Sequence, residues 1–156
     1  MSAERTCGLG HAWVVALLLA ACAGTEDDGR ERIEVTVAAP DPVTFLAEVA
    51  DSTRERQIGL MGREYLEADH GMLFVFPDEE PRAFWMKDTP IPLDMIFIRS
   101  DRRILGIVDE AEPNTTLRRS VPGDSQFVLE INGGLAKSLG IDPGQLVTFT
   151  ATVPDS

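Results

Sequence analysis

The sequence has few of the residues from which catalytic and metal centres are most often built. It contains two cysteines, Cys7 and Cys22, and two histidines, His11 and His70. They do not have the spacing of a zinc site, and no glycine-rich phosphate loop of the strand–loop–helix type occurs. These absences argue against a disulfide scaffold and a thiolate nucleophile. We therefore expect no metal and no cofactor.

Basic residues are also scarce. The chain has 14 lysines and arginines against 26 aspartates and glutamates, which gives a net charge of −12. Binding to nucleic acid depends on basic patches, so we expect no nucleic-acid partner. A high net charge of one sign also keeps a protein soluble, and this is the simpler interpretation of the acidity.

No hydrophobic run is long enough to cross a membrane. Residues 14–21, VVALLLAA, are apolar, whereas a spanning helix needs about 20 such residues. A run of this length suits the apolar part of a secretory signal peptide. Its end, Leu19-Ala20-Ala21-Cys22, resembles the bacterial lipoprotein box, which implies that Cys22 is lipidated and becomes the first residue of the mature chain. The alternative is an ordinary signal peptide in which Cys22 is incidental.

The N-terminal pattern predicts three parts of the chain: a signal peptide at residues 1–21, a lipidated flexible tether at 22–32 and a single β-rich domain at 33–153. The tether contains no hydrophobic residue larger than alanine before its end and cannot bury enough surface to fold. The membrane would be a partner through the lipid on Cys22. The resemblance to bacterial lipoproteins implies that Ala23, where aspartate is absent, directs delivery to the outer membrane if the organism has one. The predicted localisation is that of an exported cell-envelope lipoprotein.

Short strands dominate the predicted domain, with turns rich in proline, glycine and aspartate between them. The predicted strands are residues 33–37, 43–49, 72–76, 83–87, 93–98, 104–109, 126–131 and 146–153. One helix is expected from a cap at residues 51–53 to about Met61, with Ile58 and Met61 buried, and a shorter one at 134–139. The pattern indicates a mainly β (α+β) fold: an antiparallel β-sandwich or barrel-like domain with two short helices.

Residues 84–97, FWMKDTPIPLDMIF, raise the question of a functional site. An extended strand at residues 91–98 would carry apolar side chains on both faces, as expected of a strand covered on both sides. Asp94 is the exception, because burial of its ionised carboxylate costs several kcal/mol unless partners hydrogen-bond it. It is either a satisfied structural carboxylate or part of a site. Asp88 suits a turn, and Trp85 is either a core residue or a platform for a ring.

Five segments together resemble the domain-of-unknown-function 192 family, also called uncharacterised protein family 0127. They are RQIGLMGR at 56–63, GMLFVF at 71–76, FWMKDTPIPLD at 84–94, FVLEINGG at 127–134 and GIDPG at 140–144. The resemblance covers residues 33–150 and implies a small β-rich domain, often exported, with no established activity. The family usually has asparagine where this chain has Asp88. An amide both donates and accepts hydrogen bonds, whereas an ionised carboxylate only accepts them.

Polar side chains set among apolar ones are the candidates for a ligand site. The predicted ligand-binding residues are Arg63, Trp85, Asp88, Thr89, Asp94 and Glu130, and Arg56 belongs to the same polar set. One hypothesis is a tethered module that binds a small polar ligand, and another is an accessory envelope module that binds a protein. The alternative is a hydrolase in which Asp94 and Glu130 form a carboxylate pair, one pKa being raised by the other. We favour binding over catalysis, because no nucleophile or metal constellation is visible and no catalytic residue can be assigned.

Four methionines raise a separate possibility, since thioethers favour Cu(I). They are Met61, Met72, Met86 and Met95. Three of them fall on apolar faces of predicted elements, and methionine is a good filler of irregular cores. We therefore interpret them as core residues.

Overall fold

One seven-stranded sheet forms the centre of the computed structural model, which describes residues 29–154. The strands are β1 (Arg32–Val37), β2 (Val43–Ala50), β3 (His70–Glu80), β4 (Leu93–Ile98), β5 (Ile104–Ala111), β6 (Ser125–Asn132) and β7 (Val147–Thr148), and the helices are α1 (Thr53–Ile58) and α2 (Leu135–Ser138). The strand order is β5-β4-β6-β3-β2-β1-β7. The prediction of a mainly β, barrel-like domain with two short helices is confirmed.

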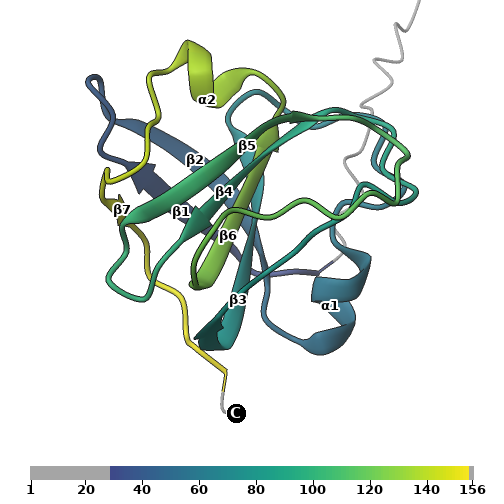
Figure 1. Ribbon diagram of the computed structural model, residues 1–156, viewed down its shortest axis with the longest axis horizontal. Coiled ribbons are helices and arrows are strands. Elements are labelled where there is room, and N and C mark those ends of the chain that lie inside the picture. Colours follow the sequence, from purple (N-terminus) through teal and green to yellow (C-terminus); the bar gives the residue numbers. More distant parts are fainter. Residues whose placement is uncertain (1–28, 155–156) are drawn as a thin grey trace, which may run out of the picture.

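The sheet curls into a half-barrel (Figure 1). An isolated bridge between Arg103 and Leu146 connects the β5 edge to the chain leading into β7. The backbone N–H of Val147 also donates to the carbonyl of Arg102 at 2.8 Å. Neighbouring strands pair antiparallel with one exception, β2 and β3, which run parallel. A parallel pair requires a crossover connection, and residues 51–69, which include α1, supply it.

Helix α1 is shorter than expected. A capping box starts it, in which the Glu55 N–H donates to Ser52 Oγ and the Ser52 N–H donates to the Glu55 carboxylate. Gly59, with φ of 51°, ends it. The expectation that Ile58 and Met61 are buried is wrong: Ile58 is 38% exposed and Met61 is half-buried. The reason is that this segment borders an open pocket rather than covering the core.

Each face of the sheet carries its own hydrophobic core. One core includes Ile96 and is closed by the α2 region through Ala136. The other includes Met72 and Met95 and is covered by loops, with Met86 fully buried among them. β4 is common to both cores, and all six of its residues are buried, which confirms the prediction of a strand covered on both sides.

Two predicted strands are largely irregular. Residues 83–87 cross one face of the sheet without joining it, and Phe84 makes only an isolated bridge to Arg119. At the C-terminus, only Val147–Thr148 pairs with β1. The chain then leaves the sheet, and Phe149 packs against Phe127 with ring centroids 5.1 Å apart.

The predicted signal peptide and Cys22 lie outside the described residues. Within residues 29–154, no helix is long and apolar enough to cross a membrane. The last part of the predicted tether is held against the fold: Arg30 and Arg32 lie 3.2 Å and 3.8 Å from the carboxylate of Glu48.

Candidate functional site

Asp94 joins three parts of the fold. Its side chain on β4 is fully buried. Oδ1 accepts hydrogen bonds from the backbone N–H groups of Glu110 at 2.8 Å and Gly134 at 2.9 Å, and Oδ2 accepts one from Ala136 at 2.8 Å. Three donors therefore satisfy the carboxylate. Of the two interpretations left open by the sequence, the geometry matches the structural one.

Asp94 and Glu130 do not form a pair. In the register of β4 with β6, Asp94 lies opposite Ile131 and Met95 lies opposite Glu130. Partners in adjacent strands share a face, and successive residues point to opposite faces. Asp94 therefore faces the core closed by α2, whereas Glu130 faces the loops on the other side. The hydrolase hypothesis required both carboxyls in one cleft, and this geometry contradicts it.

Arg63 belongs to an ion-pair cluster rather than to a pocket. Its Nη2 lies 2.8 Å from Oε2 of Glu48, which is only 4% exposed and is also approached by Arg30 and Arg32. A buried carboxylate with several arginine partners is well compensated. The cluster fastens the start of β1 to the crossover that follows α1.

Glu130 has the opposite character. It lies in the middle of β6 and is 4% exposed, with fully buried Met72 and Met95 as its neighbours on the adjacent strands. No described residue donates a hydrogen bond to its carboxyl. Burial raises the pKa of Glu130 from 4.5 to about 8. The side chain is therefore mostly a neutral carboxylic acid at pH 7.

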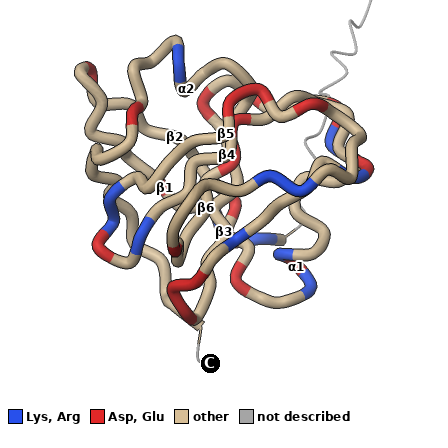
Figure 2. The backbone as a smooth tube through the Cα atoms, viewed as in Figure 1, with Lys and Arg blue, Asp and Glu red and all other residues tan. Residues whose placement is uncertain are grey.

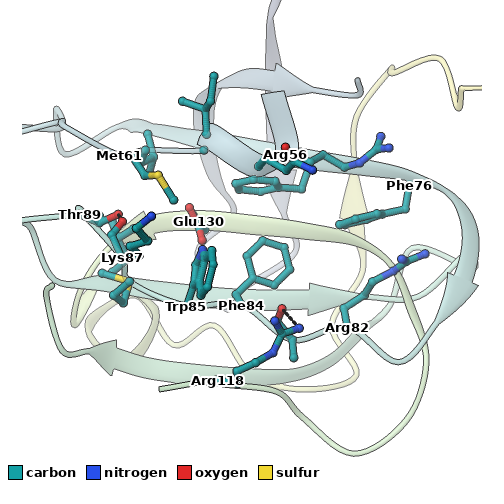
Figure 3. A pocket seen from close by; sticks show the side chains of 18 of the residues that line it. Arg56, Met61, Phe76, Arg82, Phe84, Trp85, Lys87, Thr89, Arg118 and Glu130 are labelled. Carbon is teal, nitrogen blue, oxygen red and sulfur yellow. Dashed lines mark hydrogen bonds between the residues drawn. The ribbon is translucent and has the colours of Figure 1, made fainter. Parts of the chain in front are cut away.

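A pocket of about 700 Å³ opens over Glu130 (Figure 3). Its walls come from α1 and the following turn, from the loop before β4, and from the loop before β6. The lining residues are Thr53, Arg56, Gln57, Ile58, Gly59, Leu60, Met61, Phe74, Phe76, Pro81, Arg82, Ala83, Phe84, Trp85, Met86, Lys87, Thr89, Leu93, Arg118 and Glu130. A pocket of this size, mainly apolar with a few polar groups, suits a small organic molecule.

Four cationic side chains reach this pocket, whereas Glu130 is its only carboxyl among the described residues. Arg56 is fixed by the backbone: its Nη1 donates to the carbonyl of Val75 at 2.9 Å and also to that of Asp51. Arg118 donates to the carbonyl of Ala83 at 3.1 Å. Backbone carbonyls orient a guanidinium without cancelling its charge, and neither arginine forms an ion pair with a described carboxylate.

The other two cations are only partly balanced. Arg82 pairs with the exposed Glu80, and burial lowers the pKa of its guanidinium, which remains protonated. Lys87 lies 3.9 Å from the exposed carboxylate of Asp88 and 5.8 Å from the ring centroid of Trp85. Figure 2 shows that several basic segments of the chain lie on the side of the molecule that carries α1. The pocket is therefore positive in a protein whose overall charge is −12.

Aromatic rings form much of the wall between these cations. Arg56 and Arg82 lie 5.1 Å and 4.0 Å from the centroid of the Phe76 ring. Phe84 packs edge-on against Phe76 and Phe74 with centroids 6.3 Å and 5.0 Å away. Such ring pairs and cation–π contacts stabilise the wall by about 1 kcal/mol each. They keep the guanidinium groups in place without a ligand.

Three of the six predicted ligand-binding residues line the pocket: Trp85, Thr89 and Glu130. Trp85 is 43% exposed and so is not a core residue. Asp88 is exposed and lies outside the lining, with φ of 52°. Asparagine and aspartate tolerate this left-handed conformation better than other residues with side chains. The turn thus accounts for a small polar residue at this position without a ligand.

The sequence did not identify Arg82, Lys87, Arg118 and Phe76 as pocket residues. Phe76 lies on β3 and the three cations lie in irregular segments, over a span of 42 positions that no motif connects. The loop before β6 approaches the loop before β4 through mutual backbone hydrogen bonds of Phe84 and Arg119, which no local pattern predicts. The one sequence signal for the cationic pocket was that Arg82 and Lys87, in an otherwise acidic chain, lie on either side of the apolar residues Phe84-Trp85-Met86.

Metal binding has no support from side-chain placement in the part of the chain that the structure describes. Residues 29–154 contain no cluster of three or more histidine, cysteine, aspartate or glutamate side chains. Met72, Met86 and Met95 are fully buried in one core, while Met61 lines the pocket.

Comparisons with known proteins give a family and a fold but no activity. The family model DUF192, described as "Uncharacterized ACR", matches residues 33–149. A crystal structure of a protein of unknown function from Novosphingobium aromaticivorans is 39% identical, with a TM-score of 0.76, and the match covers 78% of this chain and 87% of that one. A second structure, from Sinorhizobium meliloti, is 34% identical with a TM-score of 0.75, covering 77% and 95%. Its description proposes a transcription regulator. The search of curated proteins gave no match.

Proposed function

The chain belongs to the DUF192 family, and from that premise we propose that it is an exported, membrane-anchored module whose pocket binds a small organic anion with an aromatic or heterocyclic ring. The observation that carries this proposal is the charge of the pocket. Arg56, Arg82, Lys87 and Arg118 line a space that contains one carboxyl, itself mostly neutral at pH 7. An acidic protein that concentrates cations at one cavity favours anions there.

The aromatic walls narrow the class of ligand. Trp85 and Phe84 offer faces and edges against which a flat ring can pack, and guanidinium groups bind carboxylate, sulfonate or phosphate groups through paired hydrogen bonds. A ring with one anionic substituent uses both features. Inorganic anions alone would leave the apolar wall unused.

The membrane anchor is proposed from the sequence, and one contact gives it a geometric meaning. Arg30 Nη1 donates to the carbonyl of Gly59, which lines the pocket. Cys22 precedes Arg30 by eight residues, a span of at most about 28 Å. A lipid on Cys22 would therefore hold the pocket close to the bilayer surface.

A nucleic-acid partner does not fit this proposal, although the description of the Sinorhizobium relative proposes a transcription regulator. The net charge of −12 opposes approach to a phosphate backbone. The four pocket cations line a concave space rather than a stripe along the surface. We therefore propose small-molecule binding instead.

Calorimetric titration of the full chain in detergent tests this function. The probes are 2-naphthoate and its neutral isostere 2-naphthamide at pH 6.5. We expect naphthoate to bind at least tenfold more tightly, and Arg56→Gln to weaken its binding about tenfold, since one charged hydrogen bond contributes about 1.4 kcal/mol or more.

Arg54→Gln is the matched control, because Arg54 lies on the same helix, is exposed and does not line the pocket. The affinity of Arg54→Gln for 2-naphthoate should stay within twofold of the parent's affinity. Equal binding of the anion and the amide, or equal loss in both variants, would contradict the proposed function.

A further inference from the structure

We propose that Glu130 is a specificity-determining hydrogen-bond donor that selects, among ring-bearing anions, those with a second, uncharged acceptor such as a ring nitrogen or a carbonyl. This inference deepens the proposed function and rests on it. The geometry that supports it is a buried carboxyl that lines the pocket and has no partner among the described residues.

The cost of placing Glu130 there indicates that it serves something other than folding. A carboxyl that is 4% exposed loses most of its contact with bulk water, and burial of a polar group is unfavourable where no protein donor replaces that water. Asp94, equally buried on the other face, has three backbone donors, so this fold satisfies a carboxylate where one is structural. At position 130 no such donors are provided, and the open side is the pocket.

The neighbours of Glu130 on the sheet make it a neutral acid. Met72 on β3 and Met95 on β4 lie directly opposite it. Beyond Met72 in the same cross-strand row is Glu48 on β2, whose charge is matched by Arg63 and other arginines. The sheet therefore supplies neither a cation nor a donor to Glu130. As a neutral acid, the side chain has one O–H to donate.

The loops bring cations to the pocket but do not ionise Glu130. Arg56 from α1, Arg82 and Lys87 from the loop before β4, and Arg118 from the loop before β6 all line the same space. None of them lies within 4 Å of the Glu130 carboxyl as an ion pair, and burial alone accounts for its raised pKa. The cations remain available for the anionic group of a ligand.

Within the pocket, Glu130 lies apart from Arg56 and Arg82. Figure 3 shows Glu130 beside Trp85, with Lys87 and Thr89 on the same side, whereas Arg56, Phe76 and Arg82 lie toward the other end. A planar ligand that rests on Trp85 can therefore place an acceptor at Glu130 and its anionic group among the arginines. The ligand must supply an acceptor, because the O–H of the neutral Glu130 side chain has no acceptor among its methionine neighbours on the sheet.

A matched pair of probes tests the selection. Quinoline-6-carboxylate and 2-naphthoate have the same shape and charge and differ by one ring nitrogen. We expect the full chain at pH 6.5 to bind the quinoline at least tenfold more tightly by calorimetry. The preference should disappear at pH 9.5, where the carboxyl is ionised and repels the ring nitrogen. At pH 8, titration in two buffers of different ionisation enthalpy should show proton uptake on binding the quinoline.

Two variants separate the effect of a hydrogen-bond donor at position 130 from the effect of side-chain shape. Glu130→Gln keeps an N–H donor and should retain the preference for quinoline while losing its dependence on pH between 6.5 and 9.5. Glu130→Met matches the neighbouring methionines and should bind both probes equally. Removal of an unpartnered carboxyl is not expected to unfold the chain, and circular dichroism of each variant verifies this.

The outcomes distinguish the two proposals. If the parent binds both probes equally, with no proton uptake and no difference between the variants, the role of Glu130 is overturned while anion binding stands. If neither probe binds, both proposals are overturned. A preference that persists in Glu130→Met would also overturn the role of Glu130, because another group would then be the donor.

Discussion

At the scale of single residues, two buried carboxyls show how position determines role. Asp94 receives three backbone hydrogen bonds, and Glu130 receives none from the described residues. The first is compensated by the fold, whereas the second is retained at a cost, as functional residues often are. The sequence identified both as candidates because each interrupts an apolar strand. It could not separate them, because the separating facts are donors contributed by residues 16 to 42 positions away.

Glu130 should make stability depend on pH. Its folded pKa of about 8 lies above the value of 4.5 expected for the unfolded chain, so between these values the unfolded state loses the proton and the native state keeps it. The free energy of unfolding then falls as pH rises, by about 1.4 kcal/mol per pH unit. We expect Glu130→Gln to remove this contribution, so that its stability relative to the parent increases from pH 5.5 to pH 7.5 in urea unfolding.

The control for this measurement is Glu64→Gln, which changes an exposed glutamate in the loop after α1. It should follow the parent within about 0.5 kcal/mol at each pH. If Glu130→Gln also runs parallel to the parent, the carboxyl titrates normally in the native state and the inference from its burial is incorrect.

At the scale of elements, the regular strands were predictable and the loops over the pocket were not. Short apolar runs bounded by turn residues identified the interiors of six of the seven strands, with ends that differ by up to four residues. The segment with Phe84 and Trp85 is a similar apolar run but belongs to no strand, because its apolar residues cover the sheet instead of extending it. The pattern of apolar residues along a short segment indicates which side chains are buried, but it does not show whether a neighbouring strand pairs with that segment.

Asp94 is also a joint between elements, since it connects β4 to the end of β5 and the start of α2. In Asp94→Asn, the amide oxygen can accept from Glu110 and Gly134, but the amide NH₂ faces the N–H of Ala136. We expect a loss of about 3 kcal/mol in urea unfolding, as for a buried donor left without an acceptor.

Binding of 2-naphthoate to Asp94→Asn tests whether the substitution affects stability alone or also the pocket. Because Asp94 faces the opposite core from the pocket, naphthoate affinity under native conditions should remain within about twofold of the parent. A loss of less than about 1 kcal/mol would show that the three hydrogen bonds contribute little. An unchanged stability with weakened binding would place Asp94 in the site after all.

At the scale of the whole molecule, acidity and a cationic pocket occur together. Acidic positions occur in many parts of the chain (Figure 2), while Arg56, Arg82, Lys87 and Arg118 line the pocket. Composition alone predicted that nucleic acid is not a partner but gave no sign of the cationic pocket, because a net charge averages over positions. The cavity exists only after segments around residues 56, 85 and 118 meet.

The proposed anchor can be tested separately on the full chain. In a bacterium that processes lipoproteins, we expect the protein to incorporate labelled palmitate and to sediment with membranes, and Cys22→Ser to lose both properties. Cys7→Ser is the matched control, because Cys7 lies in the segment that would be removed, and it should behave like the parent. Labelling that persists in Cys22→Ser would exclude the lipoprotein assignment and leave the pocket proposals unaffected.

The parallel pairing of β2 with β3 has a consequence for how this family can diversify. Two parallel strands cannot be joined by a tight turn, so the topology obliges the chain to make an excursion at residues 51–69. That excursion contributes Arg56 and Met61 to the pocket, yet none of α1 is buried in either core. The rest of the excursion is constrained, because Leu60 and Leu66 are buried in the core on the pocket side of the sheet. Substitutions on α1 alone therefore change the chemistry above Glu130 at little expense to the sheet.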